Sequence, residues 1–124
     1  MTLINDRIDV RTGWVEVCDL DRLTLDRGAA SIVGGHQVAI FRLSTGALHA
    51  VDNVDPCSGS AVLSRGIVGD AGGRPTVASP LYKQRFDLGT GDCLDADVPP
   101  LTVHDIVVVD GAVFVRQRTA ATYR

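Results

Sequence analysis

The sequence predicts a single all-β domain. Short apolar segments of strand-forming residues recur along the chain, and turn-forming glycine pairs and Asp-Gly steps separate them. No stretch shows the apolar periodicity of a long amphipathic helix. The 124 residues suffice for one domain with its own core. Apolar residues make up 45% and charged residues 22% of the chain, which is typical of a globular protein.

Four strands are expected in the first half, over residues 14–18, 29–33, 37–42 and 47–51. Gly34-Gly35 supplies the positive φ angles of a tight hairpin turn between the second and the third. Asp19 is expected to cap a single helical turn that runs through Leu23. Near the C-terminus, Asp110-Gly111 separates two apolar runs, residues 106–109 and 112–116, and this pattern favours a type I′ hairpin.

The middle of the chain is different in composition. From Asn53 to Pro80 it is dense in Gly, Pro, Ser and Asp. Asp55-Pro56 indicates an N-cap followed by proline at the first helical position, with a short helical turn through Leu63. Residues 69–75, GDAGGRP, are expected to form a loop. The prediction is therefore a β scaffold around a loop-rich insertion, and function usually lies in such loops.

Charge and hydropathy exclude several classes of protein. The net charge is −3 and the pI about 5.4, whereas a nucleic-acid or anionic-membrane surface needs a basic excess. The N-terminal residues lack the apolar core of a signal peptide. The longest apolar runs are four residues, such as residues 106–109, far short of a membrane span. We expect a cytoplasmic protein without nucleic-acid or membrane partners.

The cysteines and histidines show no ligand spacing. Cys18, Cys57 and Cys93 form no Cys-x-x-Cys pair, and an odd count without a secretory signal does not indicate disulfides. The histidines at 36, 49 and 104 are not spaced with a cysteine. Because metal sites need clustered ligands, we expect ordinary thiols and imidazoles.

Two segments carry a family resemblance. Residues 79–93, SPLYKQRFDLGTGDC, follow the frame Cys-Pro-x-His-x-x-x-Phe-Asp-x-x-x-Gly of Rieske proteins, and residues 51–70, VDNVDPCSGSAVLSRGIVGD, supply the other loop. With the final hairpin, the chain resembles a Rieske-type domain, and most of all the small subunit of the cytoplasmic NAD(P)H-dependent nitrite reductase. The resemblance implies a Rieske-type (ISP-like) antiparallel β-sandwich over residues 12–117. Residues 53–92 would be its loop-rich former cluster-binding subdomain, and residues 118–124 a disordered tail.

The ligands of the Rieske cluster are missing from this frame. Two Cys and two His bind the irons of such a cluster, but here Asp55, Cys57, Ser79 and Tyr82 stand at the four positions. Phenol and alcohol groups are unsuited to iron sulfide at neutral pH because their pKa values are high. We therefore expect no Fe–S cluster and no metal in this chain. Asp55 is expected to cap its own turn, and Tyr82 to fill the former cluster volume.

The resemblance implies a non-catalytic small subunit of assimilatory nitrite reductase. The large subunit would carry siroheme, an Fe–S cluster and FAD, and would reduce nitrite to ammonium with NAD(P)H. This chain would contribute no catalytic residue and would dock on that subunit and support it. The expected interface consists of Arg65, Tyr82, Lys83, Gln84 and Arg85, a local basic patch suited to an acidic partner.

Three alternatives remain at this point. A Rieske-type electron carrier for an oxygenase has the same frame, but it requires the ligands that are missing here. A stand-alone protein-binding module would need no partner enzyme. An enzyme or redox sensor based on Cys57 is disfavoured, because the local motif holds no histidine base and Asp55 opposes thiolate formation.

Overall fold

The computed structural model describes residues 13–118. These residues form nine β-strands and two short 3-10 helices, and no α-helix occurs among them. The strands are β1 (Trp14–Asp19), β2 (Arg27–Val33), β3 (His36–Arg42), β4 (Leu48–Asp52), β5 (Ile67–Ala71), β6 (Arg74–Ala78), β7 (Arg85–Asp87), β8 (Val103–Val109) and β9 (Ala112–Arg116). The 3-10 helices are η2 (Leu20–Arg22) and η3 (Leu63–Arg65). The predicted tail lies, apart from Arg118, outside the described residues.

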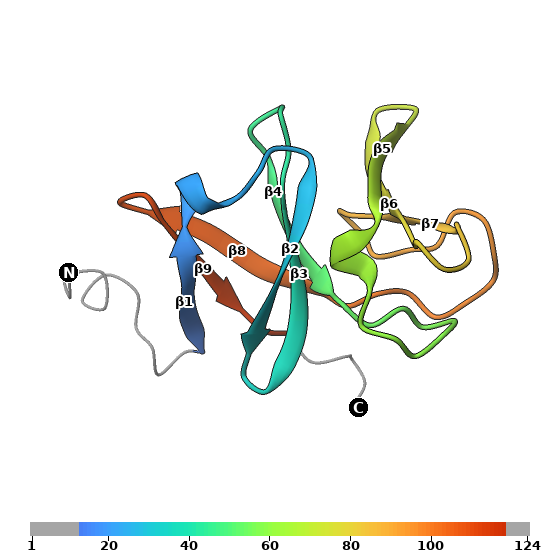
Figure 1. Cartoon of the computed structure of the whole chain (residues 1–124), viewed down its shortest axis with the longest axis horizontal. Helices are drawn as coiled ribbons and strands as arrows, with labels where there is room; N and C mark the ends of the chain where they lie inside the picture. The colour runs from blue at the N-terminus through green and yellow to red at the C-terminus, as the bar shows by residue number, and fades with distance from the viewer. Residues whose placement is uncertain (1–12, 119–124) are drawn as a thin grey trace.

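The strands form two antiparallel sheets, so the predicted all-β class is confirmed. Six strands follow the order β1-β9-β8-β4-β3-β2, and three follow the order β5-β6-β7. Figure 1 shows the larger sheet on the left and the smaller one, with its loops, on the right. Strands β4 and β8 pair over only two residue pairs. At this junction the large sheet folds over on itself, so that side chains of β3 and β9 pack into one shared core.

Strand β3 is buried on both of its faces. Its side chains alternate, so Val38 and Ile40 enter the core between the two halves of the large sheet. Ala39 and Phe41 point the other way, into the core shared with the small sheet. This position explains the uninterrupted apolar run at residues 38–41, whose four residues are at most 1% exposed.

The turn chemistry of the two predicted hairpins is confirmed. Gly34 and Gly35 have φ angles of 58° and 81°, and Asp110 and Gly111 have 53° and 80°. Positive φ at both central residues is the signature of a type I′ turn. The helical turn after β1 is present as η2, but the side chain of Asp19 makes no capping hydrogen bond.

Two local predictions in the middle of the chain are wrong. Residues 69–75 form the hairpin of β5 and β6 rather than a loop, with Gly72 and Gly73 at its turn. Pro75 is tolerated in β6 because it lies beyond the residues that pair with β7. Its carbonyl oxygen accepts a hydrogen bond from the N–H of Leu88. Asp55-Pro56 opens a hydrogen-bonded turn, and the helical residues follow only at η3, starting at Leu63.

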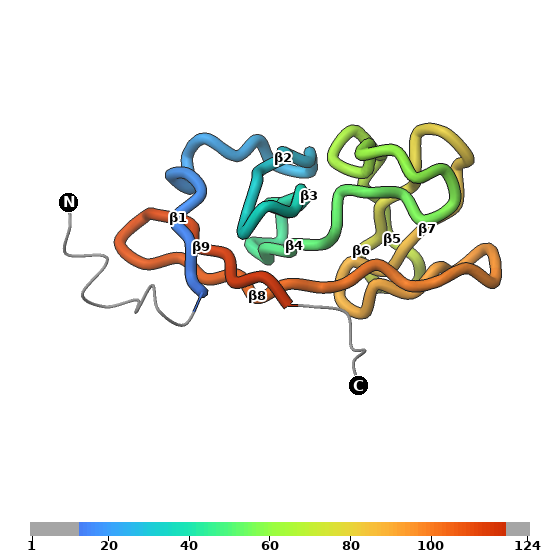
Figure 2. The backbone as a smooth tube through the Cα atoms, turned by 90° about the horizontal axis from the view of Figure 1, so that it is seen from below, coloured from blue at the N-terminus to red at the C-terminus, as the bar shows by residue number. Residues whose placement is uncertain are grey.

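The chain returns from the small sheet to β8 through a long irregular segment, residues 88–102. Figure 2 shows this segment passing along one side of the small sheet before it enters β8. Leu101 donates its N–H to the carbonyl of Gly91 at 2.9 Å, and its side chain joins the core beneath the small sheet. No helix in residues 13–118 has the length and apolar character needed to span a membrane.

Candidate functional site

The first loop of the site, between β4 and η3, is anchored by Asn53. This residue is 1% exposed, and its side-chain oxygen accepts from the N–H of Ser64 at 2.7 Å. Its side-chain nitrogen donates to Gln37 at 3.2 Å. Two residues on, Asp55 exchanges backbone hydrogen bonds with Ser60 and Gly59, and its Oδ1 accepts from the N–H of Cys57 at 2.8 Å. The expected capping by Asp55 is therefore an Asx turn.

The second loop joins β6 to β7 and turns around Ser79. The N–H of Ser79 donates to the carbonyl of Gln84, and the N–H of Lys83 donates to the carbonyl of Ser79. The hydroxyl of Ser79 accepts from the N–H of Leu81 at 3.2 Å. Lys83 has a φ angle of +68°, in the left-handed region, so the turn is sharp at this point.

A buried hydrogen-bond network joins the two loops. Ser79 Oγ donates to Asp55 Oδ2 at 2.6 Å, and Gln84 Nε2 donates to Asp55 Oδ1 at 3.3 Å. Asp55 is 0% exposed and Ser79 1% exposed. We call Asp55, Ser79 and Gln84 the loop bridge. Because its donors converge on a carboxylate away from solvent, the hydrogen bonds are of the stronger, charge-assisted kind.

The four former ligand positions thus divide into an inner and an outer pair. Asp55 and Ser79 form the inner pair and bond to each other. Cys57 and Tyr82 form the outer pair, and both are exposed. The expectation that Tyr82 fills the former cluster volume is wrong, since its side chain is 62% exposed. Hydrogen bonding by Asp55, Ser79 and Gln84, rather than an aromatic ring, closes the space between the loops.

Gln84 was expected on the partner-binding surface, but it is only 7% exposed. Its Nε2 serves the loop bridge, and its Oε1 is buried without a hydrogen-bond partner in the described part of the chain. Its side chain is therefore unavailable for a surface contact. The sequence held no signal for this role, because Gln84 and Asp55 are 29 residues apart along the chain.

Arg85 is exposed but already paired. Its Nε and Nη2 donate to the two carboxylate oxygens of Asp95 at 3.0 and 2.8 Å, and its backbone N–H donates to the same carboxylate. These hydrogen bonds lower the pKa of Asp95 to about 2. Of the other predicted interface residues, Arg65 and Lys83 have exposed side chains, and neither is ion-paired within residues 13–118.

The thiols and imidazoles do not assemble into a reactive or metal-binding centre. Desolvation and the neighbouring Asp55 carboxylate raise the pKa of the exposed Cys57 thiol, which makes the thiolate scarcer at neutral pH. His104 is buried, and its Nε2 lies 2.8 Å from Oδ1 of Asp52 on β4. It takes no part in the loop bridge. Across residues 13–118, no three His, Cys, Asp or Glu side chains are grouped so that they could hold a metal ion.

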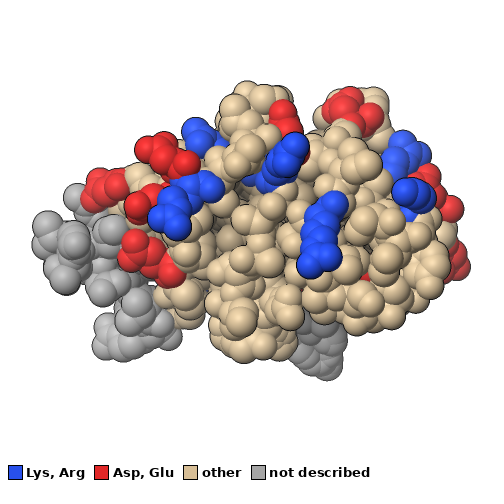
Figure 3. All heavy atoms as spheres, in the orientation of Figure 1, with Lys and Arg blue, Asp and Glu red and all other residues tan. Residues whose placement is uncertain are grey.

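The face drawn in Figure 3 shows no broad basic area. Lys and Arg side chains lie singly and alternate with Asp and Glu over the upper part of this face. The lower part, over the β2–β3 hairpin and the first loop of the site, shows almost no charge. Any electrostatic recognition on this face therefore depends on individual arginines rather than on a broad field.

The fold and the two bridged loops define a Rieske-type domain. A model of the Rieske-like [2Fe-2S] domain family matches residues 13–116. A Mycobacterium tuberculosis protein, described as an NADH-dependent nitrite reductase small subunit, has a solved structure that matches with a TM-score of 0.81 at 46% identity. The match covers 86% of this chain and 96% of that one.

The curated relatives narrow the family further. The chain is 38% identical over 104 residues to the nitrite reductase (NADH) small subunit of Escherichia coli, which covers 83% of this chain and 96% of the relative. It is also 41% identical over 102 residues to the nitrite reductase [NAD(P)H] large subunit of Klebsiella oxytoca, of which it spans only 11%. The chain therefore belongs to the Rieske-like [2Fe-2S] domain family, within the group of nitrite reductase small subunits.

The residues at the site do not fit the cluster that gives the family its description. A Rieske cluster needs two thiolates and two imidazoles. Here the inner positions hold an aspartate and a serine that are hydrogen-bonded to each other, and the outer positions hold a cysteine and a tyrosine.

An oxygenase ferredoxin is also a relative. The chain is 35% identical over 104 residues to the anthranilate 1,2-dioxygenase ferredoxin subunit of Burkholderia cepacia, and the match covers 81% of this chain and 88% of the relative.

Proposed function

We propose that this chain is a non-catalytic small subunit of an NAD(P)H-dependent nitrite reductase, which docks on the large subunit and supports it. The loop bridge is the observation that carries the proposal. It occupies the inner ligand positions with side chains that satisfy one another, so the loops keep their arrangement without iron. The outer positions remain at the surface, where they can contact a partner.

The Klebsiella relative supports the choice of partner. That protein carries the name of the large subunit, yet about a tenth of its length is similar to this chain. A domain that is a separate chain in one protein and part of a longer chain in another commonly serves the same complex in both. The large subunit would supply siroheme, an Fe–S cluster and FAD, and would reduce nitrite to ammonium. This chain would add no catalytic group, and the complex would act in the cytoplasm.

An electron-carrier role is the second candidate, because the oxygenase ferredoxin is also a relative. A carrier in this fold uses the cluster as its redox centre. The loop bridge disfavours that role, since Asp55 and Ser79 would have to break their hydrogen bond and neither provides a thiolate. Docking is the function that the site retains.

The contact surface that we propose is the outer end of the two loops. In the second loop Tyr82 is 62% exposed and Leu81 49%, and the exposed Lys83 follows them in sequence; in the first loop Val54 is 42% exposed. Tyrosine is enriched at interface hot spots, and the exposed aliphatic side chains beside it would add apolar contact area. We call these four residues the tip. Arg85 would lie at its margin in the proposed interface.

The test is binding of the purified chain to the large subunit, measured by titration. We expect a complex, and we expect Tyr82→Ala to weaken it by at least about tenfold. Truncation of a central aromatic residue at an interface costs about 2 kcal/mol or more, and about 1.4 kcal/mol corresponds to a tenfold change in the dissociation constant. Val108→Ala serves as the control, since Val108 is 39% exposed but lies on β8, in the other half of the molecule. Absence of any complex would overturn the proposed function.

A further inference from the structure

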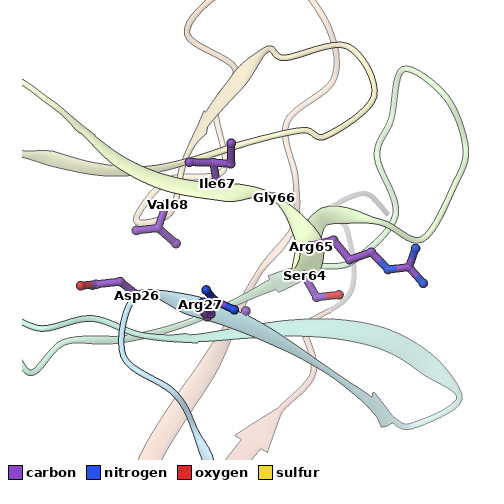
Figure 4. A pocket seen from close by; sticks show the side chains of 8 residues that line it. Asp26, Arg27, Ser64, Arg65, Gly66, Ile67 and Val68 are labelled. Atoms are coloured by element: carbon purple, nitrogen blue, oxygen red, sulfur yellow. The ribbon is translucent and has the colours of Figure 1, made fainter.

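A groove runs between the two sheets, at a distance along the chain from the tip. Its main cavity, of about 440 Å³, lies between the start of β2 and the segment from η3 into β5. Figure 4 shows Val68 pointing toward the cavity and Ile67 pointing away from it, while Arg27 and Arg65 lie at its rim. A second cavity of about 320 Å³, lined also by Asp70, shares Asp26 and Val68 with the first, so the two cavities are adjacent.

The walls of the groove are fixed in place. Gly28 on β2 lies against η3 so closely that a Cβ atom there would be 2.4 Å from the carbonyl oxygen of Ser64. Strand β2 and η3 therefore meet through backbone contact at this point. Asp26, at the bend into β2, is held by the N–H of Ser44, which donates to its Oδ1 at 2.9 Å.

Both walls are edge strands. β2 ends the six-stranded sheet and β5 ends the three-stranded sheet. The outer side of an edge strand carries N–H and C=O groups that the sheet itself does not use, and an extended segment of another chain can bind to them. Val68 supplies the apolar side chain that points into the cavity.

The two arginines at the rim have no acidic partner in the described part of the chain. Arg74, Arg85, Arg116 and Arg118 all form ion pairs with aspartates. Arg27 and Arg65 are exposed and have no ion pair or side-chain hydrogen bond within residues 13–118. A cation left unpaired next to a groove is available to a carboxylate, and arginine is enriched at interfaces for that reason.

We propose that this groove receives an extended acidic segment of the large subunit, with Arg27 and Arg65 pairing with its carboxylates. The inference rests on the proposed function and extends it, because it adds a second contact of defined chemistry beyond the tip. Charge complementarity identifies the occupant: the first cavity is lined by two free guanidinium groups and by one carboxylate, Asp26, which already accepts from the N–H of Ser44, and edge-strand backbone lies on both walls. Such a segment would lie against both sheets at once.

The experiment measures the affinity of the complex for the wild-type chain and for Arg27→Glu, Arg65→Glu and Arg22→Glu. Arg22 is an exposed arginine on η2 and lines a different cavity, so its reversal changes the net charge equally without touching the groove. We expect each groove variant to weaken binding about tenfold and Arg22→Glu to leave it within about twofold. The affinity of the wild-type complex should also fall more steeply with added salt than that of the groove variants.

The outcomes separate the two proposals. If the wild-type chain forms no complex, the proposed function fails, and the groove proposal, which rests on it, fails with it. If Tyr82→Ala weakens the complex while both groove variants bind like wild type, docking stands and the acidic-segment proposal is wrong. If Arg22→Glu weakens binding as much as the groove variants, the effect is one of net charge, and the groove proposal is also overturned. Thermal unfolding of each variant shows whether a loss of binding reflects a loss of fold.

Discussion

Replacing Asp55 with alanine is expected to destabilise the folded chain by about 3 kcal/mol, among the largest effects of any single polar substitution. The carboxylate accepts hydrogen bonds from Ser79 Oγ, Gln84 Nε2 and the N–H of Cys57. Its removal leaves these donors without their acceptor, two of them on nearly or fully buried side chains. For a domain of this size the midpoint of thermal unfolding should fall by about 10–20 °C. The measurement is thermal and denaturant unfolding of the purified chain.

Two further variants give this prediction its controls. Asp97→Ala removes an exposed carboxylate from the segment before β8 and should change stability by less than about 0.5 kcal/mol. Ser79→Ala removes one donor to Asp55 and should cost less than Asp55→Ala, because the carboxylate keeps its other hydrogen bonds. If Asp55→Ala were as stable as Asp97→Ala, the loop bridge would not hold the two loops together.

Replacing Gly91 with alanine should destabilise the chain by about 3 kcal/mol or more. Gly91 has a φ angle of +84°, and a Cβ atom there would be only 2.0 Å from the carbonyl oxygen of Leu101. The backbone of the return segment would have to move away, which would break the hydrogen bond from Leu101 to Gly91 and pull Leu101 from the core.

Gly35→Ala separates the two causes of this effect. Gly35 has nearly the same φ angle, +81°, but no atom lies within 4 Å of the position of its Cβ. Its replacement therefore measures the cost of positive φ alone, about 1–2 kcal/mol. Equal destabilisation of Gly35→Ala and Gly91→Ala in denaturant unfolding would show that the contact with Leu101 is unimportant.

The features that could be predicted from the sequence are those fixed by neighbouring residues. The hairpins at Gly34-Gly35 and Asp110-Gly111 are examples, because the turn and its flanking strands lie within a few residues. The hairpin at Gly72-Gly73 has the same turn chemistry, but Gly69, Asp70 and Pro75 give its strands a poor β pattern. Packing of Val68 and Val77 around Phe86 stabilises these strands, and that contact is not local.

The same distinction between local and long-range features holds for the site. The Rieske-like frame of residues 79–93 could be recognised because the motif is continuous in the chain. The loop bridge could not, because its members are 24 and 29 residues apart and only the fold brings them together. Tyr82 was expected to be buried on the strength of its aromatic ring, yet the space it was meant to fill is closed by shorter polar side chains. Nor did any pattern indicate that Arg27 lies across a groove from Arg65.

The claim that hydrogen bonds replace iron at this site is tested most directly by metal analysis joined to unfolding. The purified chain is incubated anaerobically with ferrous iron and sulfide, desalted and assayed for bound iron and labile sulfide, and its denaturant midpoint is compared with that of the untreated chain. We expect a colourless protein with no stoichiometric iron and an unchanged midpoint, because Asp55 and Ser79 already satisfy each other. A brown protein with about two irons per chain and a raised midpoint would contradict this, and would restore the electron-carrier role.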